Sequence, residues 1–226
     1  MIGIIGAMDI EVNALKALME NPESETVSGI EFTTGTLCGK RVVAAVCGIG
    51  KVFAAVCAQT MILRYGVRSV INTGVAGSLT AELEIGDIAV ADAAVQHDMD
   101  TSPLGDPVGL ISGINLVRLP ADSKLSEKIC AAAGRLGIRS LKGTVVSGDQ
   151  FVASAEKKAE LASEFNAIAC EMEGAAIGQV CYINNVPFAI IRSISDSYSG
   201  KGEMDYEQFK HVAAENSRAV VLELLG

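Results

Sequence analysis

Three carboxylate side chains stand just after apolar runs that are typical of buried β-strands. Glu11 follows "IGII", Glu173 follows "IAC", and Asp196 follows "FAIIRSIS". In open α/β sheets, ligands bind just beyond the carboxyl ends of the strands. One edge of a sheet could therefore gather all three carboxylates, where they could bind a ligand or serve general acid–base chemistry.

Each of these residues also has an ordinary structural explanation. Glu11 falls in the first turn of an expected helix, where the helix dipole favours a carboxylate, and Asp196 could cap a turn. In "IACEMEG", Glu171 and Glu173 share one face of an extended segment, so spacing alone does not choose between them. It is the set of three, and not any single residue, that favours a functional site.

Glycine-rich turns accompany these carboxylates. "GIIGAMDIE" (3–11), "CGIGKVFAA" (47–55) and "NTGVAGSL" (72–79) each follow or include a strand, and their small residues let the backbone come close to a ligand. The dinucleotide fingerprint GxGxxG is absent, as is a clear ribose-binding acid after the second strand. A nicotinamide-dependent oxidoreductase is therefore disfavoured.

Strands and helices alternate along the chain. The apolar runs predict strands at 2–5, 41–48, 69–74, 87–95, 141–148, 168–170 and 188–195. Helical periodicity predicts helices within 9–22, 50–66, 122–137 and 205–225. We expect a single α/β domain over 1–226, with a largely parallel sheet and helices on both faces. The segment 96–122 lacks clear periodicity and is either a functional loop or a surface excursion.

Composition narrows the class of partner and the compartment. Lysine and arginine total 18 against 27 acidic residues, a net charge of −9, and no basic stripe is present, so nucleic acid and anionic membranes are poor partners. The N-terminus reaches acids at Asp9 and Glu11 too early for a signal peptide, and no apolar run is long enough to cross a membrane. We expect a cytoplasmic protein.

The cysteines support the same expectation. They stand singly among apolar residues, without CxxC spacing, and the chain has two histidines. This pattern indicates small buried hydrophobes in a reducing compartment and neither a disulfide framework nor a zinc site. The cysteines are Cys38, Cys47, Cys57, Cys130, Cys170 and Cys181.

The motifs, taken in order, resemble those of the 5′-methylthioadenosine/S-adenosylhomocysteine nucleosidases of the nucleoside phosphorylase superfamily. The motifs are "GIIGAMDIEV", "CGIGKVFAA", "INTGVAGSL", "GDIAVAD", "VSGDQFV", "CEMEGAAI", "VPFAIIRSISD" and "DYEQF". The resemblance runs from residue 2 to the C-terminal helix and is weakest across 98–121. It implies a mixed, partly barrel-like sheet flanked by helices, and usually a homodimer. It also implies hydrolysis of the N-glycosidic bond of 5′-methylthioadenosine, S-adenosylhomocysteine and 5′-deoxyadenosine, without metal or organic cofactor.

The resemblance also implies roles for the three carboxylates. Asp196 matches the proton donor to adenine N7, for which burial at an apolar strand end would disfavour the charged form. Glu11 matches the general base that activates water on the opposite face of the sugar, as in inverting glycosidases. Glu173 matches the residue that binds the ribose hydroxyls, which leaves Glu171 structural, with Arg192 as an expected buried partner.

Further residues match the family's pocket. Met172 is expected against the sugar, Phe151 is expected to stack on adenine, and the Val152 backbone is expected to hydrogen-bond its edge. The remaining matched positions are Ser195, Met8, Ile49, Ala76, Gly77, Tyr206 and, on the 5′ side, Leu104.

Two departures from the family pattern leave alternatives open. Val75 replaces a common serine, and Leu104 and Asp106 replace aromatic residues of the wall around the 5′ substituent. Hydrolysis of 6-amino-6-deoxyfutalosine, which differs at the 5′ side, therefore stays open. A nucleoside phosphorylase is disfavoured, because the turns near the sugar contain no arginine and Glu11 would repel phosphate. A nucleoside-binding module without activity is also disfavoured, because such a protein gains little from a general base.

Overall fold

A mixed sheet forms the centre of the molecule. The computed structural model describes residues 1–198 and 202–226. In this part of the chain the sheet has ten strands, and nine of them follow the order β10-β6-β8-β9-β5-β1-β4-β3-β2. The strands are β1 (Ile2–Gly6), β2 (Glu20–Val27), β3 (Ile30–Leu37), β4 (Lys40–Val46), β5 (Ser69–Ser78), β6 (Ile88–Gln96), β7 (Leu119–Pro120), β8 (Ser140–Ser147), β9 (Ala167–Glu171) and β10 (Phe188–Asp196).

One half of the sheet closes on itself. β10 pairs with β6 at one end of the order and also with β5, so β5, β10, β6, β8 and β9 form a ring. Gly77 of β5 lies at the closing point, where it pairs with Cys170 of β9 and with Asp196 of β10. β1 and β4 extend the sheet from β5 in parallel, and β3 and β2 follow as an antiparallel hairpin. The expected partly barrel-like α/β fold is confirmed.

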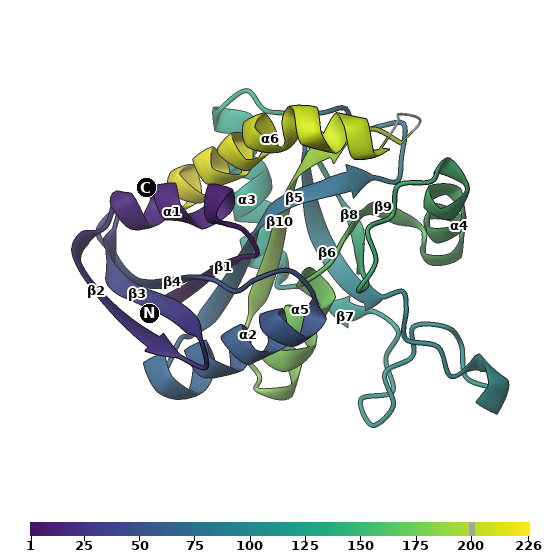
Figure 1. The fold of residues 1–226 in the computed structure, drawn as a ribbon, viewed down its shortest axis with the longest axis horizontal. Coiled ribbons are helices and arrows are strands. Elements are labelled where there is room, and N and C mark those ends of the chain that lie inside the picture. Colours follow the sequence, from purple (N-terminus) through teal and green to yellow (C-terminus); the bar gives the residue numbers. More distant parts are fainter. Residues whose placement is uncertain (199–201) are drawn as a thin grey trace.

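Helices cover both faces of the sheet (Figure 1). The layer on one side holds α1 (Asp9–Ala17), α3 (Ser123–Arg135) and α6 (Gly202–Leu225), and the other holds α2 (Lys51–Tyr65) and α5 (Gly174–Ile183). The alternation of strand side chains gives each layer its own core. Ile5 packs on the side of α2 and α5, and the neighbouring Ile4 packs on the side of α1, α3 and α6.

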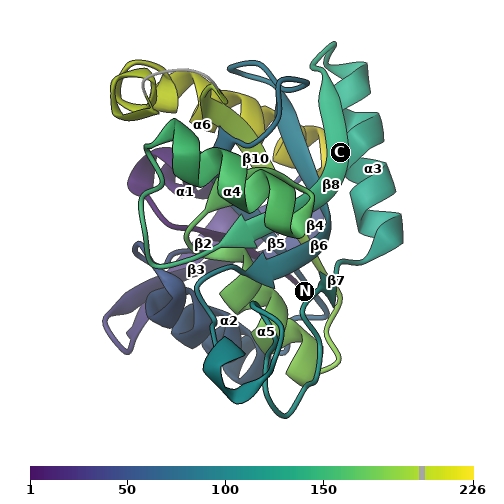
Figure 2. The ribbon, with the colours of Figure 1, turned by 90° about the vertical axis from the view of Figure 1, so that its right-hand side faces the viewer.

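A smaller core lies under α4 (Ala155–Phe165), which packs against β8 and β9 at the side of the barrel (Figure 2). Leu161 and Phe165 of α4 are buried there. The Ser154 side chain accepts a hydrogen bond from Lys157 N at 3.2 Å and so caps the start of the helix. Asn166 ends it in the left-handed conformation.

The structure corrects several sequence-based expectations. The first helix ends at Ala17, and the chain from Glu20 joins the sheet as β2. The hairpin β2–β3 and the helix α4 were not predicted. The segment 96–122 contains a short 3-10 helix (Ser102–Leu104) and β7, and Figure 1 shows it extending away from the sheet. No helix in the described part of the chain is both long and apolar enough to traverse a lipid bilayer.

Candidate active site

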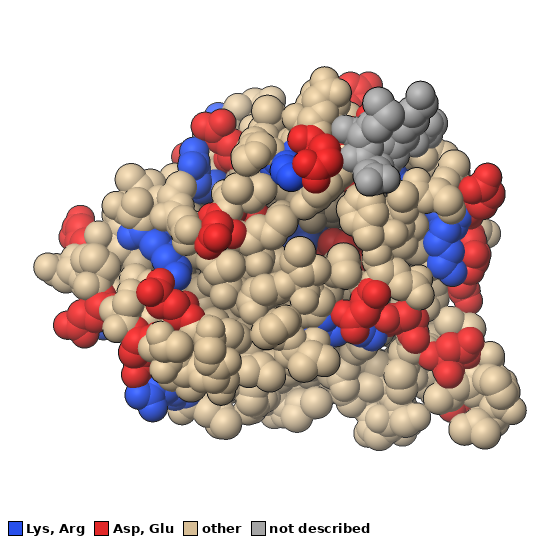
Figure 3. All heavy atoms as spheres, viewed as in Figure 1, with Lys and Arg blue, Asp and Glu red and all other residues tan. Residues whose placement is uncertain are grey.

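A cavity of about 390 Å³ opens where β5 and β10 end. Its wall includes Glu11 from the first turn of α1, Glu173 from the start of α5, and Asp196 from the end of β10. Figure 3 shows the hollow between α6 and α2, with charged side chains at its floor. The prediction that one edge of the sheet gathers the three carboxylates is confirmed.

Glu11 is held by backbone N–H groups that follow β1 and by one within β5. It is buried, and its Oε2 accepts hydrogen bonds from Ala7 N at 2.7 Å and Met8 N at 3.0 Å, while its Oε1 accepts from Val75 N at 3.2 Å. Burial raises the pKa of Glu11 above its usual value, against the opposing effects of the Arg192 charge and these backbone N–H groups. A carboxylate that is harder to ionise is a better proton acceptor near neutral pH.

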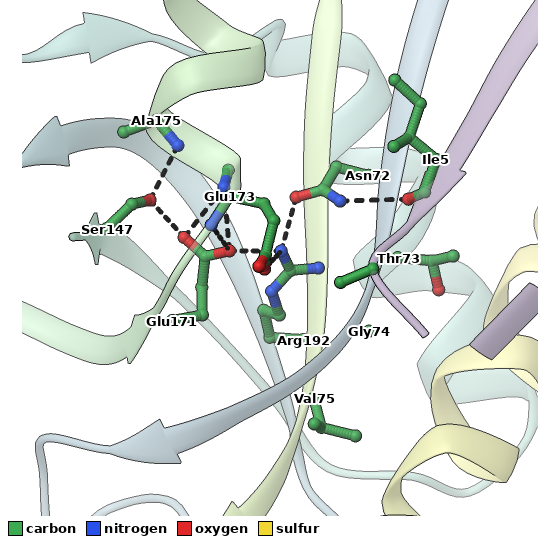
Figure 4. A network of polar contacts seen from close by, with 12 residues as sticks. Ile5, Asn72, Thr73, Gly74, Val75, Ser147, Glu171, Glu173, Ala175 and Arg192 are labelled. Carbon is green, nitrogen blue, oxygen red and sulfur yellow. Dashed lines mark hydrogen bonds and ion pairs between the residues drawn. The ribbon is translucent and has the colours of Figure 1, made fainter. Parts of the chain in front are cut away.

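A buried guanidinium organises the glutamates of the site (Figure 4). Arg192 of β10 donates to Glu171 Oε2 and, at 2.5 Å, to Asn72 Oδ1 of β5, and its Nη2 lies 3.7 Å from Glu173 Oε2. Glu171 also accepts a hydrogen bond from the Ser147 hydroxyl. The expected buried pair of Glu171 and Arg192 is confirmed, and Glu171 lines part of the cavity as well.

The same network shifts the pKa values of Glu171 and Glu173 in opposite directions. Burial opposes ionisation of Glu171, but the Arg192 charge, the Ser147 hydroxyl and the Gly174 N–H hold the pKa of Glu171 below its usual value. Burial and the negative charge of Glu171 raise the pKa of Glu173 to about 8, although Arg192 and the Gly50 N–H oppose the rise. Glu171 is thus the ionised partner of Arg192, and Glu173 is the proton-accepting group that faces the cavity.

Asp196 has partners on both of its oxygens. The Ser195 hydroxyl donates to Oδ1 at 2.9 Å, and Lys158 Nζ of α4 lies 2.5 Å from Oδ2. Lys158 and Asp196 are 1% and 3% exposed. The expected burial at the end of an apolar strand is confirmed, and the structure adds a buried ammonium group beside the carboxylate. Sequence reasoning missed Lys158.

Two glycines of β5 let these carboxylates approach the strand. A Cβ atom at Gly74 would lie 2.6 Å from Glu11 Oε1, and one at Gly77 would lie 2.7 Å from Asp196 Oδ2. Both separations are shorter than a real Cβ contact allows. A side chain at either glycine would therefore have to displace the carboxylate that lies against it.

The loop before α4 brings an aromatic wall to the cavity. Phe151 lies edge-on to Tyr206 of α6, with ring centroids 5.4 Å apart. The loop is held by Asp149, whose Oδ1 accepts from Lys51 N at 2.8 Å and whose N donates to Asp98 Oδ2 at 2.9 Å. Phe151 is half exposed, so its ring presents a flat apolar surface to the cavity.

Comparison with known proteins agrees with this geometry. The family model described as "Phosphorylase superfamily" matches residues 1–226. A 5′-methylthioadenosine/S-adenosylhomocysteine nucleosidase from Psychromonas ingrahamii is 40% identical over 227 residues, which cover 100% of this chain and 98% of the relative. The chain belongs to the 5′-methylthioadenosine/S-adenosylhomocysteine nucleosidase family.

Solved structures show the same likeness. The Neisseria meningitidis nucleosidase in complex with methylthio-immucillin-A has a TM-score of 0.94 and 38% identity, with 99% of this chain and 97% of that chain covered. A futalosine hydrolase of Helicobacter pylori has a TM-score of 0.93 and 36% identity, with 99% and 96% covered. The fold of this chain is therefore similar both to nucleosidases and to a futalosine hydrolase.

Most residues that the nucleosidase motifs indicated line the cavity. They are Met8, Glu11, Ile49, Ala76, Gly77, Phe151, Val152, Met172, Glu173, Ser195, Asp196 and Tyr206. Leu104 does not, since it is 83% exposed in the protruding segment and is not part of the cavity wall. The wall also includes Ala7, Val75, Gln150 and Cys170, which were not proposed as binding residues. Ala7, Val75 and Gln150 directly precede proposed residues, which is the signal that could have indicated them.

Replacing Arg192 tests the buried network. We expect Arg192→Met to lower the free energy of unfolding by about 3–5 kcal/mol, because it leaves buried carboxylates without their cation. The measurement is urea unfolding followed by circular dichroism. Arg64→Met is the matched control, since Arg64 pairs with Glu25 on the surface, with side chains 54% and 42% exposed, and should cost far less. Equal losses in the two variants would contradict the structural role of Arg192.

Proposed function

We propose that the protein hydrolyses the N-glycosidic bond of 5′-methylthioadenosine and S-adenosylhomocysteine, and of 5′-deoxyadenosine. The products are adenine and the 5-thio-ribose, or the 5-deoxyribose in the last case. The observation that carries this proposal is the placement of Glu11 and Asp196 against Gly74 and Gly77 of one strand. Both carboxylates line the same cavity of about 390 Å³, so an acid and a base can face one bound nucleoside.

Each carboxylate has a distinct task in the proposed reaction. Asp196 delivers a proton to N7 as the bond to adenine breaks, because adenine is a poor leaving group as an anion. The sugar becomes oxocarbenium-like, and Glu11 takes a proton from the water that attacks its opposite face. Glu173 hydrogen-bonds the ribose hydroxyls and so holds the sugar in place. No metal or organic cofactor enters these steps.

The cavity wall supports the proposed contacts of the substrate. Phe151 stacks on adenine, the Val152 backbone hydrogen-bonds the purine edge, and Met172 lies against the sugar. The edge-on contact of Phe151 with Tyr206 supports this stacking, because it fixes the orientation of the ring. Adenine recognition therefore draws on a loop that Asp149 holds in place.

The charge of the cavity favours water over phosphate as the nucleophile. The described residues of the wall include four carboxylates and neither lysine nor arginine. Arg192 lies behind Glu171 and Glu173, where its charge is already engaged. A phosphate dianion would meet repulsion from Glu11 without a compensating cation. We therefore propose hydrolysis and not phosphorolysis.

The alternative substrate is 6-amino-6-deoxyfutalosine, which shares the adenine and differs at the 5′ side. The likeness to the Helicobacter pylori futalosine hydrolase favours keeping this alternative. Relative kcat/KM values for methylthioadenosine, adenosylhomocysteine and 6-amino-6-deoxyfutalosine give the order of substrate preference. A large preference for the last would overturn the main proposal.

We further propose a homodimer in the cytoplasm that acts in methionine salvage and removes a by-product of the methyl cycle. Exposed apolar side chains gather on α2, where Val52, Phe53 and Leu63 are 74%, 55% and 74% exposed. Figure 3 shows few charged side chains over this helix. Ile183 of the adjoining α5 is 60% exposed. A second copy covering this face would bury it and would bring the segment 96–122 near the neighbour's cavity.

The catalytic roles of the acid and the base can be tested by single substitutions. We expect Glu11→Gln and Asp196→Asn each to lower kcat by roughly 10² to 10⁴, the usual contribution of a general acid or base, while adenine binding is retained. Asp9→Asn is the matched control, because Asp9 is an exposed carboxylate of the same helix turn as Glu11. Near-normal turnover of either test variant would refute the assigned role.

The choice of nucleophile can be tested from the products. With methylthioadenosine, we expect adenine release at the same rate with and without phosphate, and 5-methylthioribose as the only sugar. The measurement is adenine absorbance with chromatography of the sugar. We expect Val75→Ser to leave the reaction independent of phosphate, because a hydroxyl adds no positive charge. Phosphate-dependent formation of a sugar 1-phosphate by the unaltered protein would exclude the nucleosidase.

The proposed dimer can be tested by light scattering. We expect twice the chain mass of 23.5 kDa, and we expect Val52→Asp to shift the protein toward the monomer because it places a charge in an apolar contact. Val212→Asp on α6 is the control, since Val212 is 52% exposed on the opposite helical layer. A monomeric unaltered protein, or equal dissociation of both variants, would contradict the proposed interface.

A further inference from the structure

Lys158 is a buried cation that the proposed mechanism does not yet use. Its Nζ lies 2.5 Å from Asp196 Oδ2 and donates to the Ser197 carbonyl at 2.8 Å. Asp196 is part of the cavity wall and Lys158 is not. The ammonium group therefore sits behind the carboxylate, on the side away from the substrate.

The fold of α4 forces the lysine into this place. Lys158, Leu161 and Phe165 follow the spacing of one helix face and are all buried, so the lysine stands where the pattern calls for an apolar residue. Removing an ammonium group from water costs several kcal/mol unless a partner of opposite charge is present. The pairing with Asp196 provides that partner.

In the ion pair, the proton for the proposed reaction is bound to Lys158 and not to Asp196. In the ion-paired form, Asp196 accepts hydrogen bonds on both oxygens, from Ser195 and from Lys158, and carries no proton of its own. An ammonium–carboxylate pair nevertheless holds the same number of protons as a neutral amine beside a carboxylic acid. One proton shift from Nζ to Oδ2 converts the first form into the second.

We propose that Lys158 supplies, through Asp196, the proton that adenine N7 takes up as it leaves. The inference rests on the proposed nucleosidase reaction. An N–H bond of Lys158 breaks as an O–H bond forms on Asp196. The carboxyl group then gives a proton to N7 while the bond between the sugar and adenine breaks. Lys158 remains as a neutral amine until it regains a proton from solvent, and Glu11 releases the proton of the attacking water.

Other ionisable groups lie near the pair. Among the described residues, these are Cys170 and Glu171 on β9, His97 after β6, Lys157 on α4, and Asp205 on α6, which accepts a hydrogen bond from Ser197. Burial raises the pKa of the Cys170 thiol and lowers the pKa of His97, so both are neutral. Glu171 is paired with Arg192, and Lys157 with Glu160.

Lys158 is thus a positioning residue, since it touches Asp196 and not the substrate. The test is the pH profile of kcat with methylthioadenosine. We expect Lys158→Met to lower kcat at least 10-fold at pH 9 and to move the alkaline limb of the profile down by at least one pH unit. At pH 5.5 the loss should be smaller, because Asp196 can then take its proton from solvent. KM should change only a few-fold.

Two further variants separate proton supply from support of the fold. Lys158→Arg keeps a positive charge beside Asp196 but does not release a proton, so we expect normal thermal stability with kcat reduced at least 10-fold. The double variant Lys158→Met/Asp196→Asn should have the kcat of Asp196→Asn alone, because the lysine acts through the aspartate. If Lys158→Met does not fold, the kcat and the thermal stability of Lys158→Arg distinguish proton supply from support of the fold.

Full kcat and an unchanged profile in Lys158→Arg, or an unchanged profile in Lys158→Met, would overturn the inference and leave Lys158 as support for Asp196. Additive losses in the double variant would overturn it as well. If the unaltered protein releases no adenine from methylthioadenosine, the proposed function fails, and this inference fails with it. An active unaltered protein with an unchanged Lys158→Met profile contradicts the inference alone.

Discussion

The burial of Arg192 is the interaction on which the rest of the site depends. Its guanidinium lies inside the barrel, where an unpaired charge would be very costly, so Glu171 and Asn72 must come from neighbouring strands to meet it. Glu171 in turn accepts the N–H groups at the start of α5. The cation therefore fixes the strand end, the helix start and the position of Glu173 between them, and these elements form the floor of the cavity.

The closed sheet imposes a second constraint through β5. This strand pairs with β1, β9 and β10, so the groups at the ends of those strands must share the space beside it. Only a residue without a side chain leaves room for a carboxylate at Gly74 and Gly77. Two glycines of one strand therefore lie against both Glu11 and Asp196. The chemistry of the site and the closure of the barrel rest on the same residues.

The parts of the structure that the sequence predicts are those with a local signal. Strands buried on both faces, such as β5 and β10, appear as apolar runs, and the motifs around Glu11, Glu173 and Asp196 indicate the site. β2 has no such signal, because its side chains are exposed on nearly every position, and the buried face of α4 is interrupted by Lys158. The contact of Lys158 with Asp196 could not be predicted, since it joins residues 38 positions apart that only the packing of α4 brings together.

Two buried cations, Arg192 and Lys158, pair with different acidic groups of the cavity. Arg192 does not release its proton, so it keeps Glu171 ionised and leaves Glu173 and Glu11 as groups with raised pKa values that can accept protons or hydrogen bonds. Lys158 is paired with Asp196, and we propose that it supplies the proton that Asp196 delivers to the leaving group. In the proposed reaction, a permanent cation thus lies behind the groups that accept and an exchangeable cation lies behind the group that donates. Under the proposed mechanism, this arrangement gives each end of the glycosidic bond the protonation state that hydrolysis requires.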